Sequence, residues 1–154
     1  MPIIHDPLKI PGRTGSIYPA PFDKACKGRL KRALTQALGL TQFGINMTTL
    51  EPGAKSSLRH WHANEDEAIY VVTGEVTMID DNGEHKLGPG MIAGYPAGEQ
   101  NAHHLVNKSN ASVTYLEIGT RCKDEYATYA DVDLVGRKRE GEFTFYRKDG
   151  SRYE

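Results

Sequence analysis

The chain has 154 residues, a length typical of one domain, and a domain of this size can bury about 70% of its unfolded surface. Nineteen Lys and Arg side chains oppose twenty Asp and Glu, and the formal net charge of -1 excludes a general attraction to nucleic acid or to anionic lipid. We therefore expect a single domain over residues 1–154, with no nucleic-acid partner and no membrane partner. Two short basic stretches, residues 27–32 and 137–139, are interpreted as solvated faces.

The first residues and the cysteines indicate the cellular compartment in which the protein is expected. Residues 1–7 lack a basic flank and a long apolar run, and no segment approaches the ~20 apolar residues that cross a bilayer. Cys26 and Cys122 are far apart in sequence and too few for a disulfide framework. We expect two free thiols and a cytoplasmic protein.

The chain up to about residue 26 is rich in proline and glycine, which disfavours a helix and favours an extended arm. This arm is expected to pack on the domain or on a second subunit. Apolar residues from Leu30 to Leu38 then follow helical spacing, and Gly39 lies where a helix would end. The sequence therefore predicts one short helix before the first strand.

From Phe43 onward, short alternating or apolar segments are separated by turn residues at intervals of about ten, which is typical of an all-β sandwich or barrel. Asp81-Asn82-Gly83 is the strongest hairpin signal, because Asn-Gly readily adopts the positive φ values of a type I′ turn. The strands on either side should pair antiparallel. Seven or eight strands are expected up to Gly119, with a terminal strand or arm over residues 142–147.

Two histidines form the core of a candidate metal site. Residues two apart on a strand point to one face, so His60 and His62 can bind a single ion while Trp61 points the other way. Glu67 and an imidazole from a distant strand would complete a nitrogen and oxygen shell of the kind that binds iron, manganese, nickel or zinc. The pattern predicts one divalent transition metal.

The candidate ligands are part of a longer sequence motif. Four residues separate His62 from Glu67, six separate Glu67 from Gly74, and Gly53 precedes His60. A second pattern follows about twenty residues later, and it comprises Gly90, Pro96, Gly98, His103 and Asn107. Together the two patterns resemble the motifs of the cupin superfamily. The chain departs by one extra residue after Gly53 and two before the second-motif histidine, and both insertions fall in turns, where length varies at little cost.

The resemblance implies an all-β, double-stranded β-helix (jelly-roll) barrel. Its core would span about residues 43–120, with arms at 1–42 and 121–154 and at most a short helix. It also implies that His60, His62, Glu67 and His103 are the metal ligands. His104 is adjacent to His103 and points to the opposite face of a strand, so a shift in register would make His104 the fourth ligand.

Several of these residues also have simpler interpretations. Glu67 follows Glu65 and Asp66, and the three could form a solvated acidic loop. Asn107 could be a turn residue, and the aromatic side chains Trp61, Tyr70 and Tyr95 are interpreted first as packing. Candidate substrate contacts are Arg59, Tyr70, Asn107 and His104, and Arg59 with Lys55 could meet a phosphate.

A metal with three imidazoles and one carboxylate retains open positions, as catalytic sites do. We therefore expect a small metalloenzyme for a small hydroxylated or carbonyl compound, such as a sugar or sugar phosphate, with isomerase-type proton transfer. Similar small bacterial cupins are named sugar phosphate isomerases. The alternatives are an iron-dependent dioxygenase and a non-catalytic sensor of a small ligand, because the fold does not select among these. The resemblance also implies a homodimer.

Overall fold

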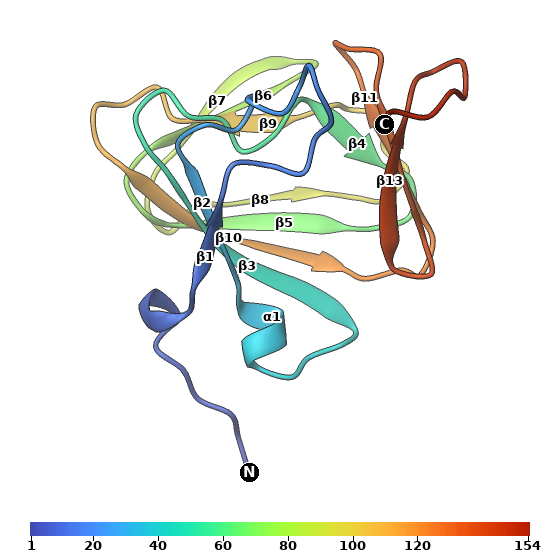
Figure 1. Ribbon diagram of the computed structural model, residues 1–154. Helices are drawn as coiled ribbons and strands as arrows, with labels where there is room; N and C mark the ends of the chain where they lie inside the picture. Colours follow the sequence, from blue (N-terminus) through green and yellow to red (C-terminus); the bar gives the residue numbers. More distant parts are fainter.

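A computed structural model describes all residues from 1 to 154, and β-strands dominate it (Figure 1). The elements in chain order are η1 (Pro7–Lys9), β1 (Gly12–Thr14), β2 (Arg29–Ala33), α1 (Leu34–Ala37), β3 (Phe43–Leu50), β4 (His60–His62), β5 (Glu67–Thr73), β6 (Val76–Asp80), β7 (Gly83–Leu87), β8 (Ile92–Tyr95), β9 (His104–Val106), β10 (Val113–Thr120), β11 (Glu125–Tyr129), β12 (Val135–Arg139) and β13 (Glu142–Tyr146).

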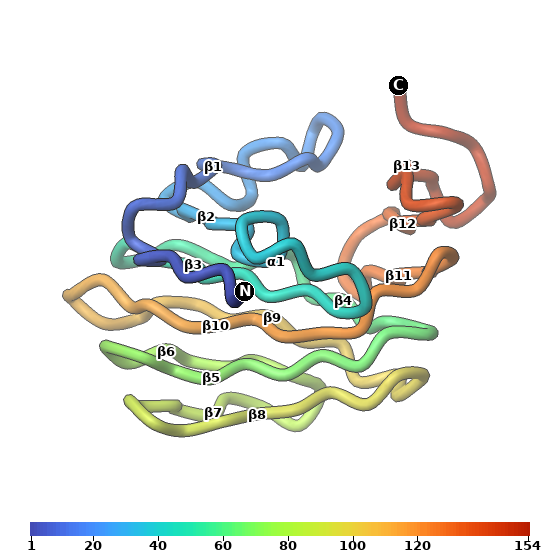
Figure 2. Tube along the Cα trace, turned by 90° about the horizontal axis from the view of Figure 1, so that it is seen from below, coloured from blue at the N-terminus to red at the C-terminus, as the bar shows by residue number.

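The strands form two layers, one above the other in Figure 1 and overlapping in the face-on view of Figure 2. One layer is a six-stranded sheet in the order β1-β2-β3-β10-β5-β8. The other contains the four-stranded sheet β13-β12-β11-β4 and the three-stranded sheet β7-β6-β9. A bridge between His60 and His103 joins these two smaller sheets. The expected all-β jelly-roll barrel is confirmed.

The apolar core lies between the layers and follows from strand alternation. On β5, Ile69 and Val71 are buried while Tyr70 and Val72 are exposed, so one face of the strand points into the barrel. On the neighbouring strand β10, Tyr115 pairs with Val71, and both Val113 and Tyr115 are fully buried. Nine buried residues form the main cluster, and they are Leu50, Ala54, Ile69, Val71, Val76, Leu87, Leu105, Val113 and Tyr115.

The prediction of a helix across residues 30–38 is wrong for its first half. Residues 29–33 form β2, which pairs with β3 and β1, and only Leu34–Ala37 are helical. A single helical turn makes few internal hydrogen bonds, whereas a strand between two neighbours pairs its backbone on both sides. Gly39, with φ +66°, follows the helix as expected.

The predicted hairpin is confirmed, but its turn type is not. β6 and β7 pair antiparallel, with Asp80 opposite Gly83. Of the residues in this turn, only Gly83 has a positive φ, +125°, so the connection is not a type I′ turn. The Asp80 carboxylate instead accepts a hydrogen bond from the Asn82 backbone N–H at 2.8 Å, which holds the turn.

Both expected arms contain strands that join the sheets. β1 and β2 extend the six-stranded sheet, and β11 pairs with β4, the strand that carries His60 and His62. A second buried cluster supports this half of the molecule, and its members are Ala127, Tyr129, Leu134 and Phe145. Cys26 and Cys122 are free thiols, as expected. None of the helices is long and apolar enough to cross a membrane.

Candidate metal centre

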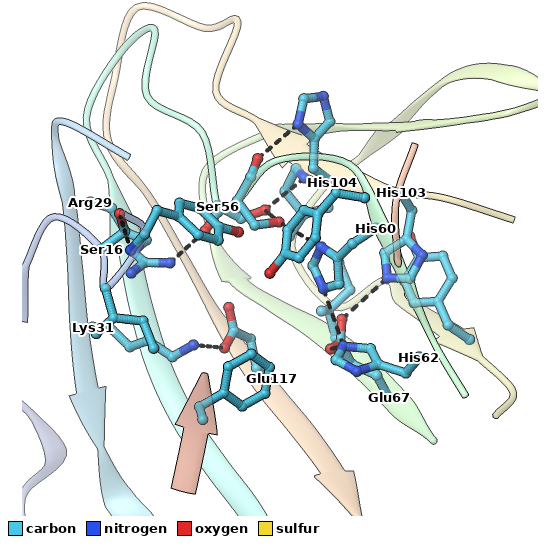
Figure 3. A pocket seen from close by; sticks show the side chains of 18 of the residues that line it. Ser16, Arg29, Lys31, Ser56, His60, His62, Glu67, His103, His104 and Glu117 are labelled. Carbon is cyan, nitrogen blue, oxygen red and sulfur yellow. Dashed lines mark hydrogen bonds and ion pairs between the residues drawn. The ribbon is translucent and has the colours of Figure 1, made fainter. Parts of the chain in front are cut away.

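The two layers of the barrel converge on a cluster of three histidines and one glutamate (Figure 3). His60 and His62 lie on β4, whose alternation points both imidazoles into the barrel, as predicted. Glu67 is the first residue of β5 in the facing layer. His103 immediately precedes β9, in the bridge to His60. Three separate segments of chain thus bring the cluster together.

The donor atoms of His60, His62 and Glu67 are close enough to share one ion. The Nε2 atoms of His60 and His62 lie 3.1 Å apart, and Glu67 lies 3.4 Å from Nε2 of both His62 and His103. Ligand atoms of His60, His62 and Glu67 all fall within 4.8 Å of one another. His103 contacts Glu67 but lies outside this set of mutually close donor atoms. The side chains of His103, His62 and Glu67 are 5%, 17% and 27% exposed, so the cluster is partly accessible to water.

Backbone carbonyls fix the orientation of two of the rings. Nδ1 of His60 donates to the Leu58 carbonyl at 2.8 Å, and Nδ1 of His103 donates to the Asn101 carbonyl at 3.1 Å. A carbonyl oxygen only accepts hydrogen bonds, so the proton of each neutral ring lies on Nδ1. Each Nε2 then directs a lone pair into the cluster, which is how proteins orient histidine ligands of metals.

The protonation states agree with this orientation. Burial, and then the neighbouring His62, lower the pKa of His60 to about 3, so its ring is neutral at neutral pH. Burial alone would raise the pKa of Glu67, but contact with the His103 ring and the hydrogen bond from His62 hold that pKa well below its usual value. Burial opposes ionisation of His62 as well, yet its hydrogen bond to Glu67 and the carboxylate charge raise its pKa. A neutral imidazole and an ionised carboxylate are the forms that bind metal.

The donor set and its spacing fit a transition metal. Two ligand atoms that are each about 2.1 Å from one ion lie about 3.0 Å apart at a right angle and about 3.4 Å apart at a tetrahedral angle. The separations in the cluster, 3.1 Å and 3.4 Å, fall in this range. Imidazole with carboxylate suits iron, manganese, nickel and zinc.

The structure brings His103 to the cluster and leaves His104 outside it. His104 is the first residue of β9, and its Nδ1 donates to the Ser57 carbonyl at 2.9 Å. Burial lowers the pKa of His104.

Tyr95, which the sequence favoured as a packing residue, stacks on the His103 ring with centroids 3.3 Å apart. Tyr95 lines the cavity and therefore belongs to the site.

Three of the predicted substrate contacts lie elsewhere. Tyr70 is 40% exposed and points outward, on the face of β5 opposite Glu67. Asn107 is fully buried, where its amide donates to the Leu50 and Ala111 carbonyls. The Arg59 guanidinium pairs with Asp81 and Asp131 at 2.9 Å each. None of the three lines the cavity, whereas His104 does.

A cavity of about 230 Å³ adjoins the cluster. It includes residues that sequence reasoning missed, and these are Arg13, Ser16, Ile17, Tyr18, Arg29, Lys31, Glu117, Tyr129, Phe143 and Phe145. Lys31 on β2 pairs with Glu117 on β10 at 2.8 Å, across the intervening strand β3. The stretch 27–32 is therefore not simply a solvated face, because Arg29 is 7% exposed. The spacing of Arg29 and Lys31, two residues apart, would have placed them on one face had this stretch been identified as a strand.

Comparison with known proteins agrees with the geometry. A family model described as the cupin domain matches residues 46–119. No curated protein sequence matches the chain. The chain is similar to the solved structure of a sugar phosphate isomerase of the cupin superfamily from Silicibacter pomeroyi, with 45% identity over 97% of this chain and 95% of that chain and a TM-score of 0.92.

Two further solved structures are similar at lower identity. A proposed sugar phosphate isomerase from Acidithiobacillus ferrooxidans is 29% identical over 80% of this chain and 79% of that chain, with a TM-score of 0.73. The polyketide cyclase RemF from Streptomyces resistomycificus is 20% identical over 78% of this chain and 80% of that chain, with a TM-score of 0.65, and supports the fold alone. From the fold, the histidine cluster and these similarities, the chain belongs to the cupin superfamily.

Proposed function

We propose that the protein is a small metalloenzyme that binds one divalent transition metal and acts on a small hydroxylated or carbonyl compound, such as a sugar or sugar phosphate, by isomerase-type proton transfer. His60, His62, Glu67 and His103 would hold the metal. The observation that carries the proposal is the contact of Glu67 with two imidazoles at 3.4 Å, beside a cavity large enough for a small molecule. A bound metal would supply a Lewis acid for a carbonyl or hydroxyl oxygen.

The rest of the cavity offers groups for binding and proton transfer. Glu117 on β10 faces the same side as Glu67 on β5, because Glu67 pairs with Gly119 and Glu117 lies two residues away on that strand. Such diagonal neighbours are about 7–8 Å apart, which leaves room for a substrate between the two carboxylates. Lys31 holds Glu117 in place at 2.8 Å. Glu117 is therefore positioned to accept or return a proton.

Aromatic side chains close part of the cavity. Tyr18 lies edge-on to both Tyr129 and Phe145, with ring centroids 5.5 Å and 5.7 Å apart. Burial raises the pKa of Tyr18 to about 12, so its hydroxyl stays protonated and is able to donate a hydrogen bond. This wall restricts water at the reacting atoms, which strengthens electrostatic interactions with a bound substrate. The name of the Silicibacter pomeroyi relative supports a sugar phosphate as substrate.

Turnover in deuterated buffer tests the reaction class. Protein loaded in turn with iron, manganese, nickel and zinc would be incubated with a panel of aldose and ketose phosphates, and carbon-bound deuterium would be followed by NMR. Deuterium incorporation that is lost in His62→Ala and Glu117→Gln supports isomerase-type chemistry. Oxygen consumption by the iron form would instead indicate a dioxygenase. Saturable binding without turnover would indicate a sensor and overturn the enzymatic proposal.

We also propose that the protein forms a homodimer. Its exposed large apolar side chains include Tyr70 and Val72 on β5 with Met91 and Ile92 at β8, the edge strand of the six-stranded sheet. An exposed apolar patch beside an open strand edge favours contact with another chain. Sedimentation at the monomer mass of 17.1 kDa would refute the dimer.

A further inference from the structure

Arg29 is a buried cation without a carboxylate partner. The residue is 7% exposed, and none of the ion pairs of the structure includes it. Its Nε and Nη2 donate to the Gly15 carbonyl at 3.0 Å and 2.5 Å, and its Nη1 donates to the Ser56 carbonyl at 2.6 Å. These partners are neutral, whereas buried charges are generally paired with an opposite charge.

Arg29 lines the cavity and has N–H groups that make no hydrogen bond within the protein. A guanidinium has five N–H groups, and the three hydrogen bonds to Gly15 and Ser56 use three of them. Figure 3 shows Arg29 and Lys31 on the side of the pocket opposite His62 and His103. Arg13 on β1 also lines this cavity and makes no hydrogen bond or ion pair through its side chain. A small molecule in the cavity could therefore contact the cluster at one end and these cations at the other.

The charge of the cavity lining favours an anion. Arg13, Arg29 and Lys31 contribute three positive charges, while Glu67 and Glu117 contribute two negative charges, so the lining has a net charge of 3 − 2 = +1 with neutral histidines. Glu117 is paired with Lys31 and Glu67 contacts imidazoles, so neither carboxylate compensates Arg29. A bound divalent ion would make the lining more positive.

We infer that Arg29, assisted by Arg13, forms an oxyanion subsite that binds the phosphate or carboxylate group of the substrate. The inference rests on the proposed function, since the same cavity would hold the substrate between this subsite and the metal. A planar guanidinium with two free N–H groups is well suited to two oxygens of one oxyanion. This assigns the anion to Arg29 and not to Arg59, whose guanidinium is already paired with two aspartates.

Titration of metal-free protein tests the subsite without the metal. Inorganic phosphate, acetate and uncharged glycerol would be added at constant ionic strength to ¹⁵N-labelled, chelator-treated protein, and binding would be followed by NMR. We expect saturable binding of phosphate or acetate at one site per chain, with shifts of the Arg29 side-chain N–H signal, and no such shifts with glycerol. Tighter binding of phosphate identifies a phosphate subsite, and tighter binding of acetate identifies a carboxylate subsite.

Three variants distinguish a role of Arg29 in anion binding from a purely structural role. Loss of a charged hydrogen-bond partner should weaken anion binding about tenfold or more in Arg29→Met. Arg13→Gln, which removes no hydrogen bond or ion pair within the protein, should weaken anion binding by a smaller factor. If Arg29→Met does not fold, the affinity of Arg13→Gln alone decides whether the subsite exists. Arg59→Gln is the matched control and should bind as the parent does.

Absence of anion binding in the parent, or equal affinity in the parent and in Arg13→Gln and Arg29→Met, would overturn the inference. Because every titration uses metal-free protein, a failure of the metal proposal leaves these results intact. Conversely, a protein that binds metal but no anion refutes the subsite alone.

Discussion

Replacement of Asn107 tests whether this residue supports the barrel or contacts a substrate. The side chain is fully buried, and its Nδ2 donates to the carbonyls of Leu50 at 2.9 Å and Ala111 at 2.8 Å. Its Oδ1 accepts from the N–H and the hydroxyl of Ser109 at 3.0 Å and 2.7 Å. All of its hydrogen-bonding groups are thus used within the protein, which leaves none for a ligand.

The expected cost of Asn107→Ala follows from these contacts. A buried backbone acceptor left without its partner costs about 1–3 kcal/mol, and each lost hydrogen bond contributes about 0.5–1.5 kcal/mol, so we expect a loss of about 2–4 kcal/mol in the free energy of unfolding. Asn107→Asp should cost more, because it places a carboxylate against the two carbonyls that now accept from Nδ2. The exposed Asn110→Ala, three residues away, serves as the control and should change stability by less than about 0.5 kcal/mol.

Urea denaturation gives the free energies, and metal content and phosphate titration give the binding properties of the same samples. With a urea dependence of about 1–3 kcal/mol per molar, the midpoint of Asn107→Ala should fall by about 1–2 M. Metal and anion binding should match those of the parent under native conditions. A variant with parental stability that no longer binds anions would refute the structural assignment and restore Asn107 as a substrate contact.

Three further predictions concern stability. Gly74→Ala should lower the free energy of unfolding, measured by urea denaturation, by about 1–3 kcal/mol. Gly74 has φ +83°, and an added Cβ would lie 2.7 Å from the Ser112 carbonyl oxygen. A variant with parental stability would contradict this. Arg59→Ala should lose less than about 1 kcal/mol, because its ion pairs with Asp81 and Asp131 are partly solvated, and a larger loss in the same assay would show that these pairs are structural. In metal-free protein, the low pKa of His60 keeps its ring neutral in the fold while the unfolded chain binds a proton below about pH 6.5. The contribution of His60 to the free energy of unfolding should thus be fully present above about pH 6.5 and should decline as the pH falls towards 3, by about 1.4 kcal/mol at pH 5.5. An equal decline in His60→Gln would exclude His60 as the cause.

Features that depend on local spacing could be predicted from the sequence. The alternation of His60, Trp61 and His62 fixes which side chains share a face, and Asn82-Gly83 marks a chain reversal between two strands. The resemblance to cupins, carried by spacings within strands, then indicated the barrel correctly. Glu67 could be placed near the histidines only through that resemblance, because nothing local shows that β5 faces β4.

Features that depend on register and on long-range pairing could not be predicted. The stretch containing Arg29 and Lys31 follows helical and strand spacing about equally well, and its pairing with β3 decides the outcome. Without the strand, both side chains were assigned to the surface and the basic side of the cavity was missed. Arg59 adjoins the proposed ligand His60 in sequence, yet its side chain does not line the cavity and pairs with Asp81 and Asp131 instead.

The choice between His103 and His104 shows the same limit. Because the second motif has two extra residues in the turn before its histidine, either His103 or His104 could occupy the position of the ligand. The backbone bridge between His60 and His103, with hydrogen bonds of 3.2 Å and 3.0 Å in the two directions, sets the register that brings His103 beside Glu67. This pairing joins segments about forty residues apart, and no local pattern in the sequence encodes it.

Metal stoichiometry tests the central claim most directly. Chelator-treated protein would be equilibrated separately with Fe²⁺, Mn²⁺, Ni²⁺ and Zn²⁺, freed of unbound metal, and analysed by mass spectrometry for metal per chain. The account predicts one tightly bound ion per chain for at least one of these metals, lost in His60→Ala and His62→Ala and retained in the control Arg59→Ala. A parent protein that holds none of the four ions, or a His60→Ala variant that holds as much metal as the parent, would contradict it.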